Sequence, residues 1–79
     1  MYYVVINYRD NTTEYLGTYG GLIMTTPRKE RRIYFEDRVV ADSTMEQLFA
    51  QNVLPDDMIS YSVMKCNNSE DERVYTQEV

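Results

Sequence analysis

The sequence predicts an α+β fold with a single, mainly antiparallel β-sheet of five or six strands and one short helix packed on one face. Most of the chain alternates apolar and polar residues with the two-residue period of strands, and polar or glycine-rich turns separate these segments. Only one stretch has the start signal and spacing of a helix. We expect the order β-β-β-β-α-β-β. At 79 residues the chain forms one domain, residues 1–79.

The first part of the chain predicts three strands joined by two tight turns. Asp10-Asn11 and Gly20-Gly21 are the turn signals. Pro27 ends the third strand because proline has no N–H to donate to a sheet. The first strand has apolar residues at the start of both faces, which favours an interior position. The three strands are expected at residues 2–9, 12–19 and 22–26.

A charged segment follows, and then a return to the sheet. Residues 28–32 form a charged tip or the start of a strand, and residues 33–40 predict the fourth strand. Glu36-Asp37 in its middle is a bulge or a tight turn, so either one bent strand or two short ones fit the pattern.

The helix is expected to start near Ser43. Ser43 and Glu46 have the spacing of a capping box, in which the serine caps the helix and the glutamate reaches back. Met45, Leu48 and Phe49 recur at helical spacing and should face the sheet. At about nine residues this helix would not be stable alone in water.

Two more strands, at residues 58–66 and 72–77, complete the sheet on either side of a polar turn. One short helix is too small to cover both faces of such a sheet. The second face should therefore be exposed, paired with another subunit or used for binding, with tyrosines such as Tyr3, Tyr19 or Tyr75 on it.

The residue types argue against catalysis, so we expect no enzyme. There is no histidine to serve as a general base. Cys66 is the only cysteine, which excludes an internal disulfide and a zinc site, and its nearest cation in sequence, Lys65, points to the opposite face of a strand. No glycine-rich phosphate loop and no calcium-loop pattern occur. We expect no catalytic residue, no metal and no cofactor.

The charge of the chain is unevenly distributed, and its hydropathy predicts where the protein is located. The net charge is −5, and residues 1–38 carry six cations and five anions (+1) while residues 39–79 carry two and eight (−6). Without a visible secretion signal or a long apolar run, we expect a cytoplasmic protein with no membrane contact. A core this small often depends on a second subunit, so a homodimer is expected.

A basic cluster at residues 28–32 is the predicted partner-binding site. The alternative is that these residues only form a solvated hairpin tip. Half of all cations lie within five residues, with a tyrosine beside them. Such a patch fits an acidic protein surface, or single-stranded nucleic acid by charge and stacking. Nucleic acid is disfavoured because the domain is acidic overall. An acidic face formed by the second half of the chain is a further possible docking surface. The predicted site residues are Arg28, Lys29, Arg31, Arg32 and Tyr34.

The leading hypothesis is a small non-catalytic domain that binds a larger protein partner and modulates or inhibits a larger macromolecule. The alternatives are a nucleic-acid-binding module that uses residues 28–32 and a structural subunit that assembles through its sheet edges. In size and composition alone, the chain resembles small accessory proteins of bacteriophages, including inhibitors of host enzymes or defence systems. No motif carries this resemblance, so it implies no functional residue.

Overall fold

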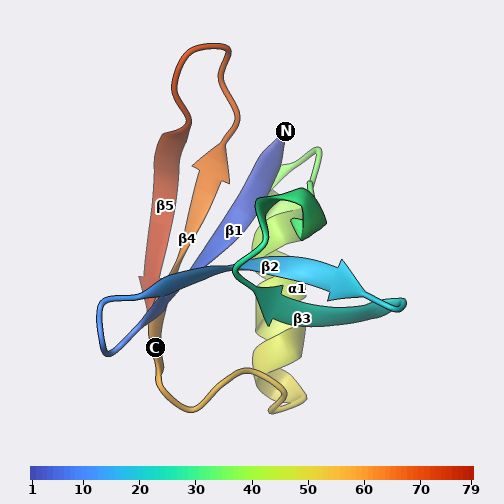
Figure 1. Cartoon of the computed structure of the whole chain (residues 1–79), viewed down its shortest axis with the longest axis vertical. Helices are drawn as coiled ribbons and strands as arrows, with labels where there is room; N and C mark the ends of the chain where they lie inside the picture. Colours follow the sequence, from blue (N-terminus) through green and yellow to red (C-terminus); the bar gives the residue numbers. More distant parts are fainter.

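A computed structural model describes all residues, 1–79, and confirms the α+β fold with one antiparallel sheet and one helix (Figure 1). The sheet has five strands in the order β3-β2-β1-β4-β5, and every neighbouring pair is antiparallel. A short 3-10 helix precedes the α-helix. In chain order the elements are β1 (Tyr2–Tyr8), β2 (Thr13–Tyr19), β3 (Leu22–Thr26), η1 (Lys29–Arg31), α1 (Arg38–Ala50), β4 (Met58–Lys65) and β5 (Glu72–Glu78).

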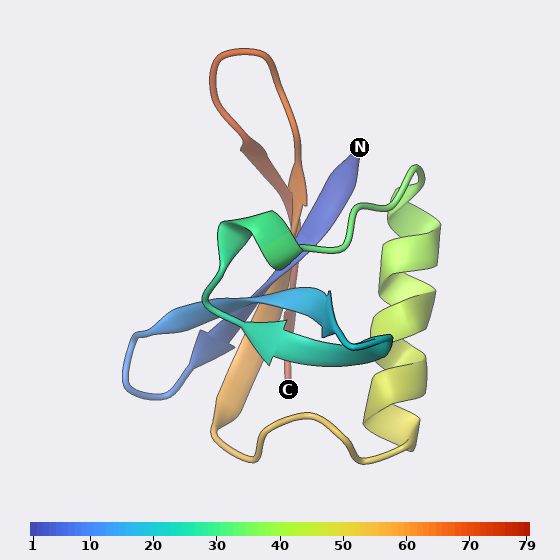
Figure 2. The ribbon, with the colours of Figure 1, turned by 45° about the vertical axis from the view of Figure 1, so that its right-hand side comes forward.

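β1 is the central strand of the sheet, as its apolar pattern on both faces predicts. Val4 and Ile6 are fully buried towards α1, and Tyr3 is buried on the opposite face. In Figure 1 the β2–β3 hairpin runs nearly horizontally, whereas β1 and β4 run obliquely and β5 is close to vertical, so the sheet is strongly twisted. α1 and the segment that carries η1 lie on opposite sides of β1 (Figure 2).

The predicted helix start at Ser43 is wrong, because the helix begins five residues earlier, at Arg38. Asp37 is the N-cap: its backbone is extended and its carboxylate accepts a hydrogen bond from the Val39 N–H at 3.0 Å. This satisfies one of the N–H groups that have no partner in the first turn of a helix. Ser43 lies inside the helix and is exposed.

The fourth strand expected at residues 33–40 is reduced to isolated bridges, and the sheet therefore has five strands. Phe35 bridges to Tyr2, Arg32 bridges to Gly17, and the rest of the segment leads into the first turn of α1. The β-branched pair Val39-Val40 resembles a strand in the sequence, but both side chains are exposed on the helix. Intrinsic propensity is a weak signal here, and burial of the other side of the helix overrides it.

One side of α1 packs on the sheet, through Ala41, Met45 and Leu48. These side chains lie in one cluster with Leu16 of β2 and Val63 of β4, among others. At 13 residues the helix is longer than predicted, and it still leaves β5 partly uncovered. No helix in the chain has the length and apolar character needed to cross a membrane.

The second face of the sheet is not fully open, contrary to the expectation from the sequence. Residues 27–35 fold across part of it and bury Tyr3. Beside them, Asn7 donates hydrogen bonds to Ser60 and Ser62 at 3.0 and 3.3 Å. Tyr75, expected on this face, instead lies on the helix side, where it packs against the core.

Candidate binding site at the β3 edge

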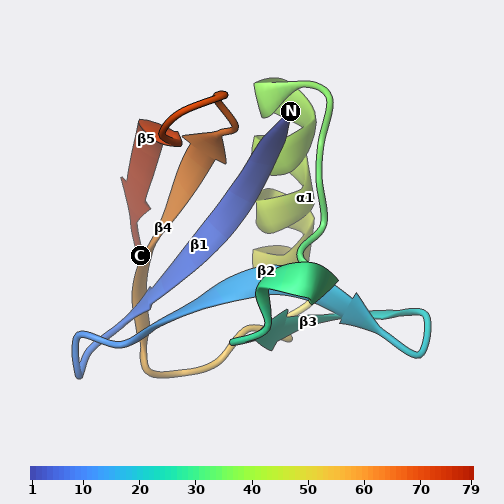
Figure 3. The ribbon, with the colours of Figure 1, turned by 45° about the horizontal axis from the view of Figure 1, so that its top comes forward.

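β3 is a free edge of the sheet, because it pairs with β2 on one side and with no strand on the other (Figure 3). Its side chains are uncharged, and Leu22, Ile23 and Met24 are 71, 46 and 43% exposed. Natural edge strands usually carry charges, prolines or bulges that prevent pairing with another chain. β3 has none of these within its five residues. The outward backbone N–H and C=O groups of β3 therefore pair with no strand, and its exposed apolar side chains lie beside them.

The turn that precedes β3 has glycine at both of its positions, which suits its backbone conformation. Gly20 and Gly21 have φ angles of +58° and +81°, in the left-handed region that other residues rarely adopt. Such a two-residue turn matches the twist of the strands that it joins. It pairs Tyr19 directly with Leu22, so that an exposed ring and an exposed leucine lie side by side at the end of the hairpin.

Two shallow hollows flank β3, one on each face of the sheet. On the helix side, Ile23 borders an apolar hollow of about 180 Å³ with Val53 and Leu54. On the other side, Met24 borders a hollow of about 360 Å³ together with Arg28 and Arg31. The edge strand therefore offers an apolar depression on one face and a mixed apolar and basic one on the other.

Part of the predicted basic cluster lies at this edge. The Arg31 guanidinium carbon lies 4.5 Å from the ring centroid of Tyr19, which holds the side chain beside the hairpin. Arg28 is exposed and forms a loose ion pair with Glu30 at 3.7 Å, and Lys29 is also exposed. Arg28 and Lys29 are thus exposed and Arg31 is half-buried, and the role of these three cations in binding stays a prediction.

The other two predicted site residues, Arg32 and Tyr34, make contacts with other residues of the chain. The Arg32 guanidinium carbon lies 3.9 Å from the ring centroid of Tyr3 and 5.0 Å from that of Tyr15. It also donates a hydrogen bond to the Tyr34 hydroxyl at 2.6 Å. Arg32 and Tyr34 thus hold residues 27–35 against the sheet, and the structure separates them from the three cations at the edge.

Reasoning from the sequence missed the apolar part of this site. The signal was present, because residues 22–26 form a strand without a single charge directly after a glycine turn. Only the strand order shows that this segment is an edge and not an interior strand.

No group of three or more histidine, cysteine, aspartate or glutamate side chains is placed to hold a metal ion. Cys66 is partly buried. Comparison of the chain with protein-family models, with curated proteins and with solved structures finds no match.

Proposed function

We propose that this chain is a non-catalytic protein-binding domain that pairs an extended segment of a larger partner protein with the free edge of β3. The observation that carries the proposal is the uncharged, apolar and unpaired edge strand. Addition of a partner strand to such an edge is a common mode of peptide recognition, in which backbone hydrogen bonds contribute affinity and pockets for alternate side chains contribute specificity. By occupying the segment, the domain modulates or inhibits the partner.

The chemistry of the edge defines the partner segment. A bound strand presents alternate side chains to the two faces of the sheet, where they meet the hollows beside Ile23 and Met24. Arg28, Lys29 and Arg31 lie beside the second hollow or close to it in the chain and favour acidic residues at one end of the segment. The expected partner segment is therefore extended, apolar at alternate positions and acidic at one flank.

A nucleic-acid partner is less well supported by the same residues. The Tyr34 hydroxyl accepts a hydrogen bond from Arg32, and the Arg32 guanidinium carbon lies 5.2 Å from the Tyr34 ring centroid, so a base stacking on this ring would compete with Arg32. Three cations remain, on a domain with a net charge of −5. Phosphate contacts would make binding fall steeply as salt rises, whereas pairing on an apolar edge would not.

The test uses the Met24→Lys variant and a matched control. The tagged protein captures partners from a bacterial lysate treated with nuclease, and binding of each purified partner is then measured by titration and by NMR of the labelled domain. Gln47→Lys makes the same charge change at an exposed position of α1, away from β3. We expect Met24→Lys to abolish binding, Gln47→Lys to leave it unchanged, and the partner to protect the β3 amides from hydrogen exchange.

Three results would contradict the proposal. The first is a partner that perturbs other strands and leaves the β3 amides unchanged. The second is binding that depends on nucleic acid and is lost on nuclease treatment. The third is a concentration-dependent dimer that pairs β3 with β3 of a second copy, which would favour self-assembly instead.

A further inference from the structure

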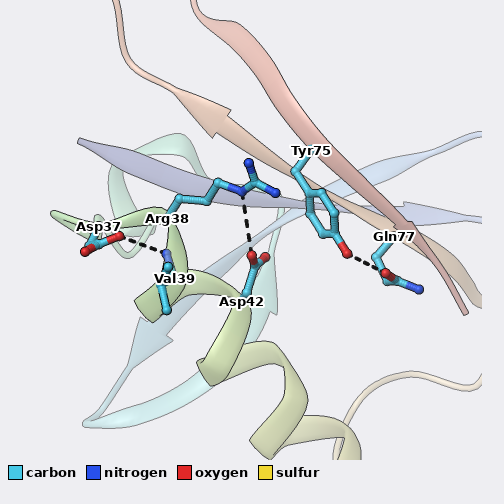
Figure 4. Close-up of polar contacts among 6 residues, drawn as sticks. All are labelled: Asp37, Arg38, Val39, Asp42, Tyr75 and Gln77. Carbon is cyan, nitrogen blue, oxygen red and sulfur yellow. Dashed lines mark hydrogen bonds and ion pairs between the residues drawn. The ribbon is translucent and has the colours of Figure 1, made fainter.

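A second concave surface lies at the opposite edge of the sheet, between α1 and β5. Figure 4 shows three of the side chains that line it, Asp42, Tyr75 and Gln77. It is a groove of about 420 Å³, within the range of roughly 300–1,000 Å³ typical of ligand sites. It exists because α1 packs on β1 and β4 and leaves the helix side of β5 uncovered. The residues used below all line it: Asp42, Glu46, Phe49, Tyr61, Tyr75 and Glu78.

The groove combines carboxylates with aromatic rings. Asp42 and Glu46 come from successive turns of α1, and Glu78 comes from the end of β5. The Tyr61 ring lies in the middle of the aromatic wall, with centroids 6.0 Å from Phe49 and 6.2 Å from Tyr75. Ring faces and carboxylates attract the same class of ligand, an organic cation.

Tyr61 supplies an observation that is independent of the acidic cluster. Its side chain is only 3% exposed, yet its hydroxyl makes no hydrogen bond within the protein. Its hydroxyl oxygen is not itself buried, because the buried unpaired polar atoms of the protein are Nε of Arg32 and Oδ1 of Asp42. The tip of this otherwise buried side chain is therefore open to a partner in the groove. Burial, with the nearby Asp42, Tyr75 and Glu46, raises the pKa of Tyr61 to about 12. The hydroxyl is neutral at neutral pH, and it can accept a hydrogen bond from a ligand in the groove that Tyr61 lines.

Asp42 is also incompletely satisfied. Its Oδ2 lies 3.7 Å from Nε of Arg38, while its buried Oδ1 accepts no hydrogen bond. The same Arg38 shows how a guanidinium fits this surface, because its central carbon lies 4.7 Å from the ring centroid of Tyr75 (Figure 4). An arginine of the chain thus already uses one ring and one carboxylate at the border of the groove.

We propose that the groove between α1 and β5 binds an arginine side chain presented by a protein segment. The planar guanidinium would lie against the aromatic wall, and its N–H groups would meet the carboxylates of Glu46 and Glu78 and the hydroxyl of Tyr61. Arginine is favoured over lysine because its flat, weakly hydrated head stacks on rings and forms several directed hydrogen bonds at once. The site is on the opposite edge of the sheet from β3 and does not depend on pairing at that strand.

The test titrates the isotope-labelled protein with short peptides that differ in one side chain. A Gly-Gly-Arg-Gly-Gly peptide is compared with its citrulline counterpart, which has nearly the same shape but no charge, and with its lysine counterpart. Free N-acetyl-argininamide shows whether the side chain alone is sufficient. We expect saturable shifts of the amides that line the groove with both arginine compounds, weaker shifts with lysine and none with citrulline.

Three variants localise the effect. Glu46→Gln and Glu78→Gln change exposed side chains and should each weaken arginine binding by about fivefold, the upper end of an exposed charge pair. Tyr61→Phe removes only the unpaired hydroxyl and should also weaken binding. Glu72→Gln makes the same charge change outside the groove, at the start of β5, and should have no effect.

Equal binding of the citrulline or lysine peptide would overturn the proposal, as would shifts outside the groove or equal effects of Glu72→Gln and Glu46→Gln. Because Met24→Lys leaves the groove untouched, it should still bind the arginine peptide. Loss of binding in that variant would also contradict a separate site.

Discussion

The guanidinium of Arg32 stacks on the ring of Tyr3, with 3.9 Å between its central carbon and the ring centroid. The Tyr3 hydroxyl in turn donates a hydrogen bond of 2.6 Å to Asp71 in the turn between β4 and β5. Tyr3 thus connects the central strand to two distant segments. It also explains why an arginine from an apparently solvent-exposed basic run is partly buried.

Arg32→Ala should lower the free energy of unfolding by about 2 kcal/mol, the value of a desolvated cation–π contact. Urea unfolding followed by circular dichroism measures the change. Arg32→Lys should recover only part of the loss, because an ammonium group has neither the flat face nor the fixed geometry of guanidinium. Arg28→Ala, at an exposed position of the same run, should stay within about 0.5 kcal/mol of the wild type. Equal effects of Arg32→Ala and Arg28→Ala would contradict the stacked arrangement.

Gly17→Ala should destabilise the protein by about 1–3 kcal/mol through overpacking. A Cβ at this position would lie 2.5 Å from the backbone oxygen of Arg31 and 2.6 Å from Cγ2 of Thr26. The segment that carries η1 would have to move away from β2. Thr18→Ala, at the exposed neighbouring position, is the control and should have a much smaller effect in the same unfolding assay. A fully stable Gly17→Ala protein would mean that residues 27–35 do not pack on β2 as described.

The free energy of unfolding should decrease as the pH rises from 10 to 12. Burial, with additional contributions from hydrogen bonds or nearby carboxylates, raises the pKa of Tyr3, Tyr8 and Tyr61 to about 12 from the ordinary value of 10.0. The folded state therefore favours the neutral phenols. Their contribution is complete below pH 10 and is lost as the pH rises towards 12, at about 1.4 kcal/mol per pH unit for each tyrosine.

Urea titrations at a series of alkaline pH values test this dependence. Tyr61→Phe is the cleanest variant because the hydroxyl that it removes makes no hydrogen bond within the protein. The free energy of unfolding of this variant should fall less steeply with pH than that of the wild type. The difference in slope should be the contribution of one tyrosine, about 1.4 kcal/mol per pH unit. The same slope in both proteins would show that the hydroxyl is not desolvated.

Asp37→Ala should lower the free energy of unfolding by about 1 kcal/mol, because it removes the N-cap of α1. Ser43→Ala should leave stability unchanged or raise it slightly, since alanine is the better residue inside a helix. Comparing the unfolding free energies of Asp37→Ala and Ser43→Ala distinguishes the two possible helix starts. A loss on Ser43→Ala with no loss on Asp37→Ala would place the start at Ser43.

Local patterns in the sequence predict much of the fold. Alternation with a period of two and the signals at Asp10-Asn11 and Gly20-Gly21 place the five observed strands to within a residue or two, because these patterns reflect the geometry of each strand and turn themselves. The strand expected at residues 33–40 is the exception, because this segment forms only isolated bridges and the start of α1. The missing histidine limits the available chemistry in the same direct way. The helix start was mistaken because Asp37 and Ser43 are both good caps, and the choice depends on which helix side meets the core.

The candidate sites depend on contacts between distant residues. No local pattern shows that Arg32 is held by Tyr3, which is 29 positions earlier in the sequence. Strand order likewise makes β3 and β5 the two edges, and α1 leaves a groove between itself and β5. Composition and periodicity therefore specify which segments form strands and which side chains are apolar. Packing in three dimensions specifies which of those surfaces stay free, because that is set by the balance of burial across the whole chain.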